Sequence, residues 1–407
     1  MKRLTALLFL SITATVHAQI DPFLLKNGVG DTIQQGLNMD AIYDRPFLDL
    51  GKTPVSIGGY MEANWQHIAT DGVSEGHQFQ FRRMTLFVSS GIGKNLKFMG
   101  EIELEDGGKE IAIEFASLDV TFHPLFNLRG GIIMNPIGAF NENHDGPKWE
   151  FTDRPISATQ MLPATWSTVG FGLFGKTYKK DWMLGYELYL SGGFDDTIID
   201  NSENKTFLPA SKEHAGRFDK SAGGTPLTTV KLAVKHTAFG ELGLSYMGGI
   251  YNNFEEDANK IDDKRRLKVM AVDYNHTLPV WDTFVTGEWA WVQVDIPETY
   301  TQHYGNKQYG GFLDVVQPIL KKRMLGWENA NLNLACRLEY VDWNVGRFKE
   351  TGYRIGDEIW NIMPGISFRP SQQTIFRLNY HIRQESDLHN NPPEKTGGFS
   401  LGVASYF

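Results

Sequence analysis

Apolar and polar residues alternate along most of the chain after residue 55. Residues 376–383 show the pattern: Phe, Leu, Tyr and Ile occupy the even positions, and Arg377, Asn379, His381 and Arg383 occupy the odd positions. Successive side chains of a β-strand point to opposite faces of its sheet. The alternation therefore predicts strands of about ten residues with one apolar and one polar face.

The links between these strands alternate in length. Short links are expected near 91–95, 123–127, 179–181, 238–241, 278–282 and 369–373, and longer polar links near 67–77, 135–167, 193–226, 252–264, 295–307, 344–355 and 385–396. Tight turns on one side and long loops on the other are typical of outer-membrane barrels. The pattern predicts an all-β transmembrane antiparallel β-barrel of about 16 strands. The count requires a strand at 309–320, and the following link, 321–331, is long for its side.

The chain finishes on alternating residues and stops at Phe407. A barrel closes by pairing its last strand with its first, because an unpaired edge in lipid leaves backbone hydrogen bonds unmet. A soluble β-sandwich or solenoid would also alternate. It does not explain the terminal Phe or the aromatic residues near the expected strand ends. These are Trp65, Trp182, Trp281, Trp343, Trp360 and Tyr406.

The N-terminus has the pattern of a secretory signal peptide. Lys2 and Arg3 precede an apolar run to Val16, and Ala18 suits a cleavage site. A single membrane helix would need a longer apolar run. The predicted organisation is a signal peptide at 1–18, a periplasmic leader at 19–54 and an outer-membrane barrel at 55–407. We expect the protein in the outer membrane of a Gram-negative bacterium, in contact with outer-membrane lipid.

The charges limit the partners and suggest which residues line the interior. The formal net charge of −9 argues against a nucleic-acid partner. Arg82 and Arg83 are adjacent, and the apolar phase of the strand selects Arg83 as inward and places Arg82 near the outer rim. Each inward charge is a candidate lining residue, or simply a hydrated wall residue paired with a neighbour. The basic candidates are Arg83, Arg129, Arg337, Arg377, Arg383, Lys231 and Lys235.

The link at 135–167 is the strongest functional candidate. Folded into the lumen, it would narrow the passage and set carboxylates opposite wall arginines, which creates a transverse field. The alternative is a loop that lies outside, over the mouth of the barrel. Its acidic candidates are Glu142, Asp145, Glu150 and Asp153.

Motifs for chemistry are missing from the sequence. It contains no Gly-x-Ser-x-Gly, no His-Glu-x-x-His, no phosphate-binding loop and only one cysteine, Cys336. The acidic stretch 252–263 lacks the ligand spacing of a calcium loop. We therefore predict no catalytic residues, no metal and no cofactor.

Two stretches, 81–106 and 128–156, resemble the phosphate-selective porin family, porins O and P. The matching residues are Arg82, Arg83, Arg129, Gly131 and Pro136. The resemblance implies a homotrimeric, sixteen-stranded porin whose third loop folds inward and whose lumenal arginines and lysines attract phosphate. This chain departs from that pattern in being net acidic, with an inner wall of mixed sign.

These observations predict a porin for passive diffusion of small hydrophilic solutes, with anions such as phosphate as one candidate class. The alternative is a barrel plugged by residues 19–54 and the long loops, which acts as a binding or structural protein. A hydrolase that uses a rim Ser and His is the third hypothesis, and no residue spacing supports it.

Overall fold

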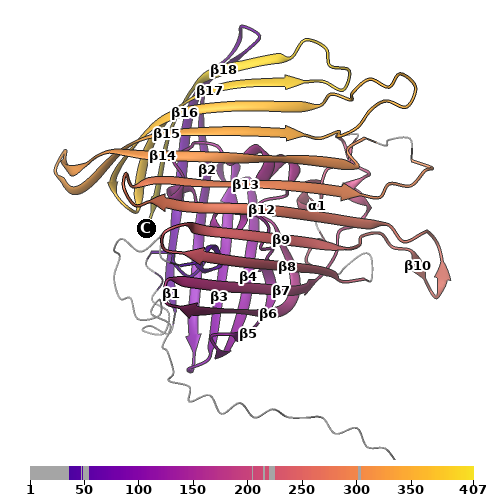
Figure 1. Ribbon diagram of the computed structural model, residues 1–407, viewed down its shortest axis with the longest axis horizontal. Helices are drawn as coiled ribbons and strands as arrows, with labels where there is room; N and C mark the ends of the chain where they lie inside the picture. Colours follow the sequence, from indigo (N-terminus) through magenta and orange to yellow (C-terminus); the bar gives the residue numbers. More distant parts are fainter. Residues whose placement is uncertain are drawn as a thin grey trace, which may run out of the picture.

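Alternating strands close into a barrel. The computed structural model describes residues 36–46, 48, 55–203, 205–213, 216–219, 225–300 and 304–407. In these residues, sixteen antiparallel strands form one closed sheet, so the predicted fold class is confirmed (Figure 1). The strands are β1 (Ser56–Thr70), β2 (Val73–Ile92), β3 (Leu96–Glu105), β4 (Glu110–His123), β5 (Phe126–Met134), β6 (Ser167–Lys179), β7 (Trp182–Ser191), β8 (Leu227–His236), β9 (Gly240–Ile250), β12 (Arg266–Leu278), β13 (Thr283–Val294), β14 (Lys307–Met324), β15 (Trp327–Asp342), β16 (Glu358–Ser371), β17 (Thr374–Ser386) and β18 (Glu394–Tyr406).

Short elements lie in the long links, among them a small hairpin and a short α-helix. The strands β10 (Glu255–Glu256) and β11 (Asn259–Lys260) pair as a hairpin between β9 and β12. The single-turn helix α1 (Ala210–Glu213) lies between β7 and β8. Among the described residues, no helix is both long and apolar enough to cross a bilayer.

The barrel closes where β1 pairs with β18. Tyr60 lies opposite Tyr406 in this register. Beyond the last strand residue, Gly59 N–H donates to the Phe407 carbonyl at 3.1 Å, and Phe407 N–H donates to the Gly59 carbonyl at 3.0 Å. The terminal residue thus continues the ladder, as its alternating sequence predicts.

Deleting Phe407 should weaken this closure. The change removes two backbone hydrogen bonds, and each is worth about 1 kcal/mol in water and more in lipid. We expect the temperature at which the folded band is lost on semi-native gels to fall by several degrees. Replacing Phe407 with Leu keeps the backbone pair and should lower it less. Equal loss for the two variants would show that the ring, and not the ladder, carries the effect.

The two faces of the wall differ in chemistry, as predicted. Leu378 on β17 is 41% exposed on the outer face, whereas its neighbours Arg377 and Asn379 are buried on the inner face. The same division holds on β15, where Leu338 is exposed and Arg337 is buried. An apolar outer surface suits contact with lipid. Closure of the sheet leaves no backbone hydrogen bond of the wall unpaired, which hydrocarbon requires.

Aromatic side chains gather near both ends of the outer face. Trp289 stacks on Tyr340 with ring centres 6.2 Å apart, and Tyr340 contacts Trp360 at 4.7 Å, towards the long links. Trp182 and Trp281 are exposed beside short turns at the other end. Such bands are typical of the two bilayer interfaces.

Two of the aromatics predicted for these bands lie elsewhere. Trp343 is buried in an apolar cluster, and Tyr406 is buried on the inner face, where its hydroxyl donates to Asp145. Proximity to a strand end did not identify the face on which either ring lies.

Two predicted links are almost entirely strand. The link expected at 67–77 is a two-residue turn, since β1 runs to Thr70 and β2 begins at Val73. The long link expected at 321–331 is likewise a turn at Leu325 and Gly326, both at positive φ (50° and 95°). Figure 1 shows the β14–β15 hairpin projecting beyond the neighbouring short turns. These strand ends lack a regular apolar alternation and therefore look like loops in the sequence.

Candidate functional site in the barrel interior

The segment 135–166, between β5 and β6, contacts distant strands across the interior. Ile156 N–H donates to Glu339 on β15 at 2.7 Å. Thr152 N–H donates to Asn379 on β17 at 2.9 Å. These strands are far from β5 and β6 in the strand order around the barrel. Hydrogen bonds from backbone N–H groups of the segment to inward-facing side chains of the wall therefore hold it in place.

Most of the predicted basic lining residues form buried ion pairs with wall carboxylates. Burial makes each pair costly to break, because the remaining charge would be left unpaired. The positive charges are thus largely neutralised where they lie. The pairs are Arg83 with Glu103 (2.5 Å), Arg129 with Asp119 (2.8 Å), Arg337 with Asp314 (2.7 Å), Lys231 with Asp273 (3.2 Å) and Arg377 with Glu62.

The other two basic candidates lie nearer the ends of the barrel. Lys235 on β8 donates to the Gly36 carbonyl at 2.5 Å. Arg383 on β17 is half-buried and lies between Asn361 and Thr396 of the adjacent strands.

The position of Arg82 differs from the one expected from the apolar alternation of its strand, which placed it near the outer rim. Glu62 pairs with Arg83 but Ala63 pairs with Phe81, so a β-bulge leaves Arg82 without a partner position. The bulge lets two adjacent side chains point the same way. Arg82 therefore reaches inward to Asp153 at 2.6 Å and does not face the outer rim.

The predicted acidic residues of segment 135–166 are buried or half-buried, and most are paired. Asp145 binds Arg45, Glu150 binds Arg369 at 2.8 Å, and Asp153 binds Arg82. Glu142 differs, since neither of its carboxylate oxygens has a hydrogen-bond partner among the described residues. Burial, reinforced by Glu187, raises the pKa of Glu142 well above its usual value, so its neutral form is favoured.

The segment 36–46 also contacts inward side chains. Asn38 N–H donates to both carboxylate oxygens of Glu241 on β9, at 2.9 and 3.1 Å. Asp40 pairs with Lys176 on β6 at 2.7 Å. Ile42 packs into an apolar cluster with Met99 of β3 and Phe115 of β4, which both belong to the wall. The segment is thus bound by both polar and apolar contacts at the end of the barrel with the short turns.

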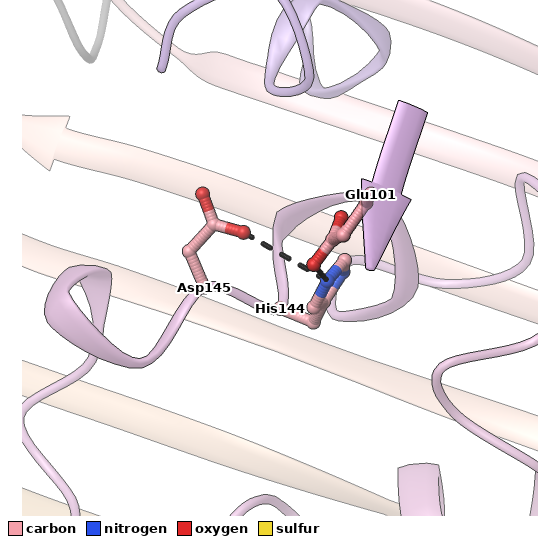
Figure 2. Close-up of side chains that lie close together, drawn as sticks. All are labelled: Glu101, His144 and Asp145. Atoms are coloured by element: carbon pink, nitrogen blue, oxygen red, sulfur yellow. Dashed lines mark hydrogen bonds and ion pairs between the residues drawn. The ribbon is translucent and has the colours of Figure 1, made fainter. Parts of the chain in front are cut away.

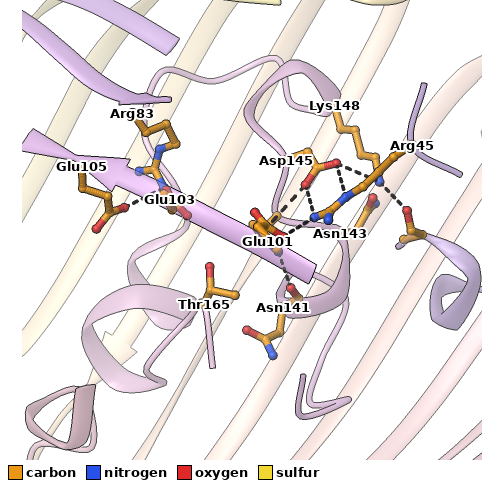
Figure 3. A network of polar contacts seen from close by, with 12 residues as sticks. Arg45, Arg83, Glu101, Glu103, Glu105, Asn141, Asn143, Asp145, Lys148 and Thr165 are labelled. Atoms are coloured by element: carbon orange, nitrogen blue, oxygen red, sulfur yellow. Dashed lines mark hydrogen bonds and ion pairs between the residues drawn. The ribbon is translucent and has the colours of Figure 1, made fainter. Parts of the chain in front are cut away.

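Arg45 of this segment makes buried contacts with two carboxylates (Figure 3). Its guanidinium donates to Asp145 through Nε at 3.0 Å and Nη2 at 2.7 Å, and Nη2 lies 2.7 Å from Glu101. Its centre lies 3.8 Å from the ring centre of Phe87. The hydroxyl of Tyr406 donates to Asp145 at 2.8 Å. We refer to these surroundings of Arg45 as the Arg45 pocket. The pocket joins residues 36–46 to both the wall and segment 135–166.

The charged groups of the pocket stabilise one another's ionised forms. Burial alone would lower the pKa of Arg45, but Asp145 and Glu101 raise it well above its usual value. Burial alone would raise the pKa of Asp145, but Arg45 and Lys148 hold it well below its usual range. Both groups are therefore ionised, which is the state that bidentate pairing requires.

Glu101, His144 and Asp145 lie close enough to suggest a metal site (Figure 2). Their ligand atoms are within 4.8 Å of one another. However, His144 Nδ1 lies 2.8 Å from the Asn141 carbonyl and Nε2 lies 3.2 Å from Glu101, so both nitrogens face oxygen acceptors. Arg45 contacts both carboxylates. This donor set fits a hydrogen-bonded ion network and not a metal-ion site.

The pKa of Asp44 leads us to expect that residues 36–46 bind less tightly to the barrel interior at high pH. Burial raises the pKa of Asp44 to about 7, an effect that Lys148 opposes and Asp40 reinforces; Lys176 and Lys235 oppose it further. The stabilisation is fully present below the carboxyl's ordinary pKa and is lost as pH rises through about 7. We expect the open probability in planar bilayers to rise several-fold between pH 5.5 and 8, and Asp44→Asn to reduce this dependence. An identical pH profile in that variant would contradict the assignment.

Comparisons with known proteins establish the fold. No family model matches the chain. A protein of uncharacterised function from Aquifex aeolicus is 35% identical over 168 residues, which is 40% of this chain and 36% of that protein. The chain thus aligns with little more than a third of this relative.

Several solved structures share the architecture at low sequence identity. OprB of Pseudomonas putida matches 87% of this chain and 94% of its own, with a TM-score of 0.54 and 9% identity. The channel DcaP of Acinetobacter baumannii matches 87% and 97%, with a TM-score of 0.53 and 13% identity. An anion-selective porin from Comamonas acidovorans matches 87% and 99%, with a TM-score of 0.50 and 11% identity. At these identities the similarity shows the porin-like barrel fold.

Proposed function

We propose that this protein is an outer-membrane channel for passive diffusion of small hydrophilic solutes, closed in this structure by residues 36–46 and narrowed by 135–166. One observation carries the proposal. Both segments are bound to a charged inner wall through ion pairs and hydrogen bonds, which water can replace, in addition to apolar contacts. An inner wall that carries paired charges along its length suits a passage that fills with water when a segment leaves.

The location and assembly belong to the same proposal. An apolar outer face with two aromatic bands supports insertion in a bilayer, and a signal peptide at 1–18 would deliver the chain to the outer membrane. The solved channels with this fold are consistent with that location. We further propose a homotrimer, as the resemblance to the phosphate-selective porins implies. No chemical step is part of the proposed function.

Anion preference, including preference for phosphate, stays a prediction. It would depend on inward basic residues, and Arg83, Arg129, Arg337, Arg377 and Lys231 each have a carboxylate partner. Paired charges give a weaker net field than free ones. Reversal potentials in a salt gradient would decide between anion preference and none.

A second candidate is a permanently closed barrel that serves as a binding or structural protein. The apolar cluster towards the long links favours it, because Ile198 and Leu208 pack there against Val269 of β12 and Val292 of β13. Apolar packing of this kind has no polar contacts for water to take over. This candidate predicts that removing 36–46 leaves the barrel closed.

Liposome swelling with sugars of graded size separates the two candidates. We expect liposomes with the full chain to swell slowly, and those with residues 36–46 deleted to swell at least ten-fold faster in small sugars. Empty liposomes and a chain with Ile261→Arg, an exposed change in a long link, are the controls. Equal, negligible swelling for the full and deleted chains would contradict the channel and favour the closed barrel.

A further inference from the structure

The pocket that holds Arg45 is built by parts of the chain other than the segment that carries this residue. Glu101 comes from β3, Phe87 from β2, Asp145 from segment 135–166 and Tyr406 from β18. A second ring, Phe115 of β4, lies 5.3 Å from the guanidinium centre. The pocket therefore keeps its walls when residues 36–46 leave.

The two carboxylates also keep contacts that hold them in place. Tyr406 donates to Asp145 Oδ2, and His144 Nε2 lies 3.2 Å from Glu101 Oε1. Neither contact involves segment 36–46. An empty pocket would thus present two oriented carboxylates beside the face of Phe87, at positions that are buried while Arg45 is in place.

This arrangement is selective for a planar cation. A guanidinium places parallel N–H groups on one carboxylate and stacks its flat face on an aromatic ring, which an ammonium does not do. Arg45 makes both kinds of contact here. The observed side chain therefore shows which ligand the pocket fits.

We propose that this pocket is a binding site for solutes that carry a guanidinium group, and that Arg45 occupies it as an internal ligand when the channel is closed. Such solutes, with free arginine as the simplest, compete with Arg45 and favour release of residues 36–46. The inference rests on the proposed channel function and adds a solute class to it. Because two carboxylates line the pocket, repulsion between like charges disfavours an anionic solute at this point.

Lys148 is a group of the chain itself that would compete with the solute for Asp145. Its Nζ lies 3.7 Å from Asp145 and donates to the Ala41 carbonyl at 3.2 Å. When residues 36–46 leave, the ammonium loses that carbonyl and can move closer to Asp145. Lys148→Met in the emptied pocket should therefore tighten arginine binding.

Calorimetric titration of the full chain carrying Arg45→Ala, in detergent, tests the site. L-arginine is the probe, and citrulline is its neutral isostere. We expect arginine to bind about 10- to 100-fold more tightly than citrulline, the range expected for charge-assisted hydrogen bonds. L-lysine should bind more weakly than arginine. The wild-type chain, whose pocket is occupied, should bind arginine more weakly than the variant.

Two further variants keep the test decisive. Adding Asp145→Asn should abolish the preference for arginine over citrulline, and adding Phe87→Leu, which leaves both carboxylates, should weaken arginine binding several-fold. Equal binding of arginine and citrulline to Arg45→Ala would overturn the inference, and so would an unchanged preference in both added variants.

The two proposals fail in different ways. If Arg45→Ala conducts ions but does not distinguish arginine from citrulline, the binding site is wrong and the channel stands. If the variant binds arginine selectively but never conducts, the site stands and the channel is wrong.

Discussion

Replacing Arg45 with Met should expose segment 36–46 to water-soluble reagents at least a hundred-fold faster. Removing one partner of a buried ion pair typically costs 3–5 kcal/mol, because the remaining charge is left unpaired. Asp145 would keep Tyr406, Lys148 and His144 as partners, and Glu101 would keep His144. A cost of that size corresponds to a change in population of about two orders of magnitude or more.

The labelling rate of a cysteine at position 41 measures this exposure. Ala41 is 8% exposed, and the native Cys336 would be replaced with Ser to leave one thiol. Arg347→Met, which removes an exposed arginine in the link between β15 and β16, is the matched control and should not change the rate. If Arg45→Met labels no faster than the control, Arg45 does not hold the segment.

Leu244→Arg should lower the free energy of unfolding in lipid vesicles by about 2–4 kcal/mol, the cost of an arginine at the middle of a bilayer on the outer face of a barrel. Leu244 is 52% exposed and lies near the middle of β9. Ile261 is equally exposed, at 53%, but lies in a long link. Ile261→Arg should cost less than about 0.5 kcal/mol, as surface changes usually do.

Urea titrations of both variants in vesicles would measure the difference. A cost for Leu244→Arg as small as that for Ile261→Arg would mean that water, and not lipid, covers the outer face of β9. The outcome thus tests the membrane location independently of any transport.

Much of the barrel could be predicted from sequence because its wall obeys a simple period. Wherever a strand crosses the apolar layer, the outer side must be apolar and the inner side is free to be polar, as at Leu338 and Arg337. The period fails where that layer ends. The tip of the β14–β15 hairpin and the ends of β1 and β2 are strands with no apolar face, so they were predicted as links.

The interior was harder to predict because its contacts are not periodic. Arg82 points inward only because of a β-bulge, and nothing in the local sequence marks the extra residue. Arg45 lies in a polar stretch predicted as a leader, and its partners Glu101 and Asp145 are 56 and 100 positions further along the chain. The clue in the sequence is an arginine beside Tyr43 and Phe47, in a region otherwise expected to be solvated.

Single-channel recording in planar bilayers tests the central claim most directly, namely that the barrel encloses a passage closed by its own residues 36–46. We predict that the wild-type chain is mostly closed, and that Arg45→Met and deletion of 36–46 both give long openings of the same conductance. The Arg347→Met control should behave as wild type. Openings that are equally frequent in all four proteins, or absent from all four, would contradict the claim.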